Sequence, residues 1–231
     1  MKKGDMKKQD ILKTAETRFC RYGYETTSIQ DILDDLHTSK GSFYHHFISK
    51  EALLEEVCRN RALSVSEMIL RELEKAPSLP EKLNLLLSGI LPLEGEKLSF
   101  LLMLLPVFSM PEGVCIRNCY AKVLSEIYSP VLTEMLKKGT EEGLFSCSDP
   151  MFSARLSVLL VNQYWLEICD LILLSEKSGQ VADPSDLLSV TSQYRISLER
   201  ILSAPFGLIE LMNFPQLKAV SEAIHQHWKQ S

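Results

Sequence analysis

The stretch that decides the fold lies at residues 26–47 and has the sequence TTSIQDILDDLHTSKGSFYHHF. It predicts two short helices joined by a tight turn at His37–Thr38, and the run from Thr27 to Gln30 resembles a capping box that starts the first helix. The second helix, Ser39–His46, has small polar residues at its start and aromatic residues at its end. Small donors can reach base edges while aromatic side chains lock a helix onto its own domain, so this pattern suits the major groove of DNA.

Apolar positions recur at helical spacing through nearly the whole chain, and no segment has the alternation typical of a strand. The helix before the quoted stretch, about residues 7–22, ends at Gly23, which suits a left-handed cap. Ser49 caps a fourth helix that extends to about Lys75. Further helices are expected at about 80–91, 96–108, 112–143, 150–176, 184–203 and 215–229, separated by Pro and Gly residues. The sequence therefore predicts an all-α fold.

Charge is distributed unevenly along the chain. Residues 1–50 contain nine Lys or Arg and seven Asp or Glu, whereas residues 51–231 contain 16 and 23 and give the chain its net charge of −5. An acidic body is repelled by nucleic acid, so any contact with DNA belongs to the amino-terminal end. We expect a helix-turn-helix domain at 1–50, with the motif itself at about 27–46, and a larger helical ligand-binding and dimerisation domain at 51–231.

Composition excludes several classes of protein. The 231 residues are 45% hydrophobic and 24% charged, which is ordinary for a globular protein. The charged start of the chain lacks the apolar core of a signal peptide, and the apolar stretch 100–108 is shorter than the about 20 residues that span a bilayer. The longer stretch 156–174 carries Asn162 and Glu167 and is expected to be a buried helix. We therefore expect a cytoplasmic protein without membrane contact, whose six cysteines are reduced.

Two runs of residues near the amino terminus carry a family resemblance. The first is Ile11-Leu12-x-x-Ala15-x-x-x-Phe19-x-x-x-Gly23-Tyr24-x-x-Thr27-Ser28-Ile29-x-x-Ile32, and the second is Ser39-Lys40-Gly41-Ser42-Phe43-Tyr44-His45-His46-Phe47-x-Ser49-Lys50-Glu51-Ala52-Leu53. Together they resemble the helix-turn-helix domain of TetR-type transcriptional regulators, over about the first 55 residues. The resemblance implies a homodimeric regulator, most simply a repressor, that binds a palindromic double-stranded DNA operator and is released by a small apolar or amphipathic effector.

The resemblance also implies which side chains contact DNA. Thr27 and Ser28 match positions that cap the second helix and bind a phosphate. Lys50 matches a phosphate-binding lysine at the start of the fourth helix, where the helix dipole also favours an anion. Gly41 leaves room for the backbone to approach DNA closely. The full set of expected DNA contacts is Thr27, Ser28, Thr38, Ser39, Lys40, Gly41, Ser42, Tyr44, His45 and Lys50.

One position departs from the pattern of the family. The turn has the sequence Leu36-His37-Thr38, and His37 stands where the family usually has a Gly with positive φ. Histidine tolerates that conformation better than a β-branched residue does, at some cost in free energy. The angle of the recognition helix therefore depends on how His37 is accommodated in the turn.

Polar side chains interrupt the apolar pattern of the helix expected at 150–176. Asn162 and Trp165 share one of its faces, and a polar group inside an apolar helix needs a partner or water. Two interpretations stay open, a ligand cavity and a polar seam at a helix end or dimer surface. Apolar walls for a cavity are available in the segment 98–110 and at Tyr120. The residues expected to bind an effector are Met103, Phe108, Cys119, Tyr120, Asn162 and Trp165.

Other candidate sites have simpler explanations. Cys115 and Cys119 lie four residues apart on one helical face, which allows a thiol sensor or a chelating pair, but small core residues explain the spacing as well. His225 and His227 diverge on their helix and favour solvated positions. The sequence contains no phosphate loop, nucleophile elbow or zinc-protease motif. We therefore expect no enzyme activity, no metal and no cofactor.

Two functions from different classes fit these observations. A repressor would dimerise, because a helix-turn-helix protein binds two half-sites about one helical turn apart. Its dimer interface is expected on the helices at 150–176 and 184–203, at Ala154, Ser157, Val158, Val161, Tyr194, Ser197, Leu198 and Ile201. The alternative is a helical interaction module that binds another protein instead of DNA, which the small positive charge balance of residues 1–50 allows.

Overall fold

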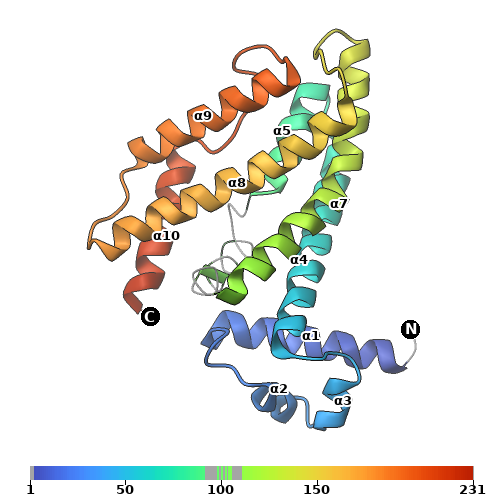
Figure 1. The fold of residues 1–231 in the computed structure, drawn as a ribbon, viewed down its shortest axis with the longest axis vertical. Helices are drawn as coiled ribbons and strands as arrows, with labels where there is room; N and C mark the ends of the chain where they lie inside the picture. Colours follow the sequence, from blue (N-terminus) through green and yellow to red (C-terminus); the bar gives the residue numbers. More distant parts are fainter. Residues whose placement is uncertain are drawn as a thin grey trace. The chain divides into compact units, whose positions relative to one another are not determined.

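The computed structural model of the chain describes residues 3–91, 98, 100, 102, 104–105 and 111–230. Regular structure in these ranges is helical, which confirms the all-α prediction, with an amino-terminal helix-turn-helix and a larger helical region after it (Figure 1). The predicted helix at 96–108 lies mostly outside the described residues. The helices are α1 (Lys3–Tyr22), α2 (Ile29–Asp35), α3 (Lys40–Tyr44), α4 (Lys50–Leu73), α5 (Leu79–Gly89), α7 (Pro111–Glu141), α8 (Pro150–Lys177), α9 (Pro184–Leu202) and α10 (Phe214–Gln230).

Contacts between Cα atoms divide the chain into two compact units. The amino-terminal unit comprises Met1–Leu63 and Gly95–Tyr120, and the carboxy-terminal unit comprises Ser64–Glu94 and Ala121–Ser231. Helices α4 and α7 therefore contribute residues to both units. This division does not test the functional domain boundary expected after residue 50, which stays a prediction.

The amino-terminal unit is built around an aliphatic and aromatic core. Ile11, Leu12, Ala15 and Phe19 share one face of α1 and are at most 3% exposed, whereas Tyr22 at the end of the helix is 53% exposed. The four buried residues form the α1 side of the core. They pack with buried side chains of the next three helices and with Phe100 and Leu104. The core includes Ile11, Leu12, Ala15, Phe19, Ile32, Leu33, Phe43, Phe47, Leu53 and Leu54. Each large aliphatic or aromatic side chain contributes about 1.5–3 kcal/mol when fully buried, so this core supplies the free energy that holds the short helices α2 and α3 against α1 and α4.

The carboxy-terminal unit contains α8 and α9 packed along each other, with α10 packed against both (Figure 1). Two tyrosines join α8 to α9 by hydrogen bonds. The Tyr164 hydroxyl lies 2.9 Å from Thr191 Oγ1, and the Tyr194 hydroxyl donates to Glu167 Oε2 at 2.5 Å. Burial and the neighbouring Glu167 carboxylate raise the pKa of Tyr194 to about 12, so this hydroxyl keeps its proton and remains a donor at neutral pH.

The structure corrects most of the predicted dimer interface. Its members Ala154, Ser157, Val158, Val161 and Leu198 are at most 1% exposed within a single chain, because α8 packs against α9 and α10 of the same chain. Such side chains are not available to a second copy. Of the remaining members, Ser197 is exposed and Tyr194 and Ile201 are half-buried. The helical spacing identified a buried face correctly, but it did not identify what buries that face.

Among the described helices, α8 alone is long and apolar enough to cross a membrane, by length and composition only. The apolar window has a mean hydropathy of 1.4, and 50% of it is buried inside the protein. A core helix passes the same test, and the buried residues of α8 include Tyr164 and Ile168 near its middle. The packing therefore agrees with the buried helix that the sequence predicted.

A buried carboxylate fixes the segment between α9 and α10. Glu199 is 4% exposed and accepts hydrogen bonds from the Arg195 guanidinium at 2.9 Å. The same carboxylate accepts the backbone N–H of Gly207 at 2.7 Å and that of Ile209 at 3.3 Å. Because a buried charge is stable only when it is well paired, the ion pair and these two N–H groups hold the segment in one path.

Replacing Glu199 by Ala should lower the free energy of unfolding by about 3 kcal/mol, because a guanidinium and two N–H groups would lose their acceptor. Urea unfolding followed by circular dichroism measures this change. Glu222→Ala is the matched control, since Glu222 is exposed and pairs with Lys218 on one helix at 3.8 Å. The control should change the free energy of unfolding by less than about 0.5 kcal/mol. Equal, small losses in both variants would contradict the role given to Glu199.

Candidate nucleic-acid interface

The start of α2 is fixed by a reciprocal capping box, one residue later than predicted. Ser28 is the cap: its backbone N–H donates to Asp31 Oδ2 at 2.7 Å, and its Oγ accepts the Asp31 N–H at 3.1 Å. The Ser28 hydroxyl also donates to Asp31 Oδ2 at 2.6 Å, and this hydrogen bond, together with the one from the Ser28 N–H, lowers the pKa of the Asp31 carboxyl. Thr27 is instead 1% exposed, and its hydroxyl donates to the Gly23 carbonyl at 2.8 Å. The structure therefore gives Thr27 a structural role and removes it from the exposed surface.

The turn between α2 and α3 confirms the expectation for His37. Its φ is +46°, so a side chain with a Cβ occupies the left-handed region that glycine usually fills. The turn is closed by the Thr38 N–H, which donates to the Leu33 carbonyl at 3.0 Å. Histidine is accommodated because its side chain is exposed and needs no space inside the turn. The helix-turn-helix forms without a glycine at this position.

An ion pair that the sequence analysis missed ties α2 to α1. The Arg18 guanidinium contacts both carboxylate oxygens of Asp35, with Nε at 2.5 Å and Nη2 at 2.8 Å. The hydrogen bonds from Arg18 lower the pKa of the Asp35 carboxyl. A bidentate pair of this kind fixes direction as well as distance, so it orients the end of α2 just before the turn. Because the partners are 17 residues apart, no local pattern in the sequence indicates the contact.

Helix α3 packs against the core with one face and exposes the other face to solvent. Ser39 caps it by accepting the Ser42 N–H at 3.4 Å. Phe43 is fully buried and Phe47 is 4% exposed, with their ring centroids 5.6 Å apart. From the turn to the end of α3, the exposed residues are His37, Ser39, Lys40, Gly41, Tyr44 and His45, with Thr38 and Ser42 half-buried beside them. Polar side chains and a glycine thus face outward while the aromatic side chains anchor the helix.

Lys50 lies at the start of α4, as the resemblance implied, with its ammonium held close to the protein. Its Nζ lies 4.1 Å from the centroid of the Tyr24 ring and donates to the Glu25 carbonyl at 3.4 Å. Burial lowers the pKa of this ammonium. Ser49 caps the same helix by accepting the Ala52 N–H at 3.1 Å. The half-buried ammonium is positioned by these contacts and retains part of its surface for an outside partner.

The residues expected to bind an effector are only partly described. Met103 and Phe108 lie outside the described residues, as do the side chains of Cys115 and Cys119. Tyr120 is half-buried against the core of the amino-terminal unit, whereas Asn162 and Trp165 belong to the carboxy-terminal unit, with Trp165 6% exposed. The effector site stays a prediction. In the part of the chain that the structure describes, no group of three His, Cys, Asp or Glu residues is arranged to hold a metal ion.

The sequence of this region matches a known family. The model described as "Bacterial regulatory proteins, tetR family" matches residues 11–57. This range begins in α1, contains all of α2 and α3, and ends within α4. The match therefore covers the capping box, the turn, the exposed surface of α3 and the contacts of Lys50.

Curated relatives agree with the family match. The uncharacterized HTH-type transcriptional regulator YerO of Bacillus subtilis is 34% identical over 122 residues, which are 52% of this chain and 42% of that protein. The HTH-type transcriptional repressor KstR2 of Mycolicibacterium smegmatis is 41% identical over 54 residues, 23% of this chain and 26% of that protein. The matches thus span less than half the length of either relative.

Solved structures share the fold over almost the whole chain. The crystal structure of RolR in complex with the ligand resorcinol has a TM-score of 0.54 at 15% sequence identity, and covers 96% of this chain and 94% of that one. At this identity the likeness concerns the fold alone.

Replacing His37 by Gly should raise the free energy of unfolding by about 0.5–1 kcal/mol, because glycine adopts φ of +46° without a Cβ clash. His37→Val should lower it, since β-branched residues are the least tolerant of positive φ. His45→Gly serves as the control: His45 has a helical φ of −68°, so glycine should be destabilising there. Urea unfolding of the three variants measures the order, and a loss of stability in His37→Gly would contradict the strain assigned to this turn.

Proposed function

We propose that this chain, which belongs to the TetR family of bacterial regulatory proteins, is a sequence-specific DNA-binding transcriptional repressor. The proposal rests on one observation: one face of α3 is buried through Phe43, while Lys40, Gly41 and Tyr44 on the other face are exposed. A helix anchored from behind with small and polar residues in front is what the major groove accepts. The name of the relative KstR2 supports repression as the direction of regulation.

The proposed DNA contact uses the predicted residues that the fold leaves accessible. Ser42 and His45 are proposed to contact base edges, and Tyr44 and Lys50 to bind phosphates. Binding of the Lys50 ammonium to a phosphate is favoured because it releases a counterion from the DNA. The contact set is Ser28, Thr38, Ser39, Lys40, Gly41, Ser42, Tyr44, His45 and Lys50. In this proposal residues 1–50 form the DNA-binding domain, and residues 51–231 form the domain for dimerisation and effector binding.

A homodimer is proposed because an operator with two half-sites requires two recognition helices. Helix α8 carries a stripe of exposed apolar side chains on one face, with Phe152 63% exposed, Leu159 48% and Leu174 63%, and the exposed Gln163 and Asp170 interrupt this stripe. Leu156 and Leu166 are half-buried at positions of the same helical spacing. Exposed apolar surface of this extent is unfavourable in water, and a second copy of α8 would cover it. We propose this stripe as the dimer interface in place of the expected residues that are buried within a single chain.

We propose that a small apolar or amphipathic effector binds in residues 51–231 and lowers the affinity for the operator. The resorcinol complex of RolR, a protein of the same fold, supports a small-molecule effector. The candidate residues are those expected from the sequence: Asn162 and Trp165 of α8, and Met103, Phe108, Cys119 and Tyr120. A coupling free energy of about 1–3 kcal/mol would lower operator affinity about 5–150-fold.

We also propose that the protein works in the cytoplasm, without membrane contact or enzyme activity, because both curated relatives are named as regulators of transcription. The alternative, an interaction module that binds a protein instead of DNA, is not favoured by those names. It predicts that no duplex binds even at low salt, whereas a regulator binds selected sequences with a steep dependence on salt.

Gly41→Ala separates DNA binding from folding. A Cβ at Gly41 would meet only Ser39 Oγ, at 3.8 Å, and Ala is favoured over Gly in a helix by about 1 kcal/mol, so the variant should be at least as stable as the wild type. Its affinity for a duplex selected from a random pool should fall at least about 10-fold, because the methyl group would separate the backbone of α3 from DNA.

Fluorescence anisotropy at two salt concentrations measures this affinity, and a thermal melt checks the fold. Ser189→Ala, an exposed change on α9, is the control and should bind DNA like the wild type. A wild-type chain that binds no duplex at low salt would contradict the proposed function. Undiminished binding by Gly41→Ala would contradict the proposed contact of α3 with DNA.

Leu159→Glu tests the proposed dimer. A carboxylate at the centre of the α8 stripe would be buried without a partner in the dimer but hydrated in the monomer, so the variant should sediment as a monomer. Val181→Glu is the matched control, because Val181 is 50% exposed but lies beyond the end of α8. Analytical ultracentrifugation should show a dimer for the control and the wild type. A wild-type monomer, or a dimer that survives Leu159→Glu, would exclude this interface.

A further inference from the structure

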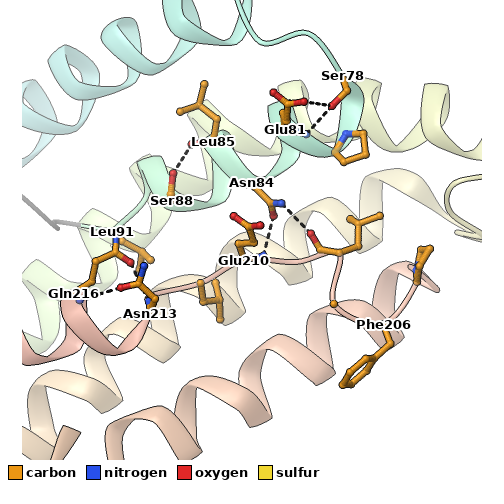
Figure 2. A pocket seen from close by; sticks show the side chains of 15 residues that line it. Ser78, Glu81, Asn84, Leu85, Ser88, Leu91, Phe206, Glu210, Asn213 and Gln216 are labelled. Atoms are coloured by element: carbon orange, nitrogen blue, oxygen red, sulfur yellow. Dashed lines mark hydrogen bonds between the residues drawn. The ribbon is translucent and has the colours of Figure 1, made fainter.

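A groove of about 760 Å³ lies in the carboxy-terminal unit, between α5 and the segment that connects α9 to α10 (Figure 2). Leu85 and Ser88 line it from α5, and Phe206, Glu210 and Leu211 line it from the connecting segment. None of the six residues expected to bind an effector lines this groove. Its volume is within the range of pockets that bind small molecules.

The walls of the groove are fixed without any ligand. Figure 2 shows Asn84 reaching from α5 to the connecting segment, where its Nδ2 donates to the Leu208 carbonyl at 2.8 Å and its Oδ1 accepts the Glu210 N–H at 2.9 Å. Glu199 holds the same segment by accepting the Gly207 N–H. A ligand that enters the groove would therefore not have to order its walls, which keeps the entropic cost of binding low.

The ionisable side chains that line the groove are both acidic, and a cation, the Arg195 guanidinium, lies beside the ring of Phe206. Glu81 and Glu210 line it, and no Lys, Arg or His is found among the described lining residues. Glu81 accepts a hydrogen bond from Ser78 Oγ at 2.9 Å, and both carboxylates are exposed. Two carboxylates without a cationic neighbour in the lining attract positive charge and repel anions.

The groove also presents apolar surface to solvent. Phe206 is 81% exposed, although its ring lies only 4.5 Å from the Arg195 guanidinium. Leu85 and Leu211 are half-buried in the lining. Exposed aromatic and aliphatic surface favours the apolar part of a ligand at about 25 cal/mol for each Å² that is covered. A ligand that suits this groove therefore combines a positive charge with an apolar body.

We propose that this groove binds an organic cation with an apolar body, of the alkylammonium class. The ammonium lies near the carboxylates of Glu81 and Glu210, and the alkyl part covers Phe206 and Leu211. The proposal does not rest on DNA binding, because every residue it uses belongs to the carboxy-terminal unit.

Isothermal titration of the full chain with octyltrimethylammonium, below its micelle concentration and without DNA, tests the site. Tetramethylammonium should bind more weakly because it lacks the chain, and octanoate should not compete because its charge is repelled. Glu81→Gln and Glu210→Gln should each weaken binding about 5-fold, and the double variant by more. Glutamine keeps the hydrogen-bonding shape of each side chain, so folding should be preserved, which a thermal melt checks.

Glu222→Gln is the control, since Glu222 is exposed on α10 outside the groove, and it should bind octyltrimethylammonium like the wild type. Phe206→Ala should weaken the alkylammonium but leave tetramethylammonium unchanged. Three results would overturn the proposal: no heat of binding, equal binding of octanoate, or full affinity in the double variant. Because DNA is absent from this titration, a negative result would contradict the cation site without contradicting the proposed repressor function. A failure to bind DNA would likewise leave the cation site untouched.

Discussion

The burial of Phe43 and Phe47 is the interaction on which the rest of the amino-terminal unit depends. Helix α3 has five residues, far fewer than the about 12–15 that an isolated helix needs to be stable in water. Its free energy of formation therefore comes from packing these rings into the core formed by α1, α2 and α4. The same packing sets the direction in which Lys40, Gly41 and Tyr44 are displayed, so the surface proposed to meet DNA is a consequence of the core behind it.

The elements that could be predicted from sequence are those whose information is local. Helical spacing of apolar residues gave α1, α4 and the long helices of the carboxy-terminal unit, and the family pattern gave positive φ at His37. The capping box was displaced by one residue. Thr27 and Ser28 carry equivalent hydroxyls, and only the fold decides that Thr27 enters the core while Ser28 takes the extended backbone of a cap.

The features that could not be predicted depend on partners far away in the chain. Asn84 binds the backbone of Glu210, 126 residues later, and Arg18 pairs with Asp35 on the next helix. Neither partner is indicated by periodicity or by a local motif. The buried face of α8 shows the same limit, because spacing assigned Ala154 and Val158 to a common face, whereas intrachain packing decided that this face is core. The DNA contacts and the dimer interface remain proposals, because each depends on a partner molecule outside this chain.

The central claim is that two copies of this chain each place one α3 in the major groove. Hydroxyl-radical footprinting on a duplex selected from a random pool tests it most directly, because it reports which part of the DNA each copy protects. The account predicts two protected regions related by a dyad, with centres about 10 base pairs or a multiple of that number apart. A single protected region without symmetry, or no protection on any selected duplex at low salt, would contradict it.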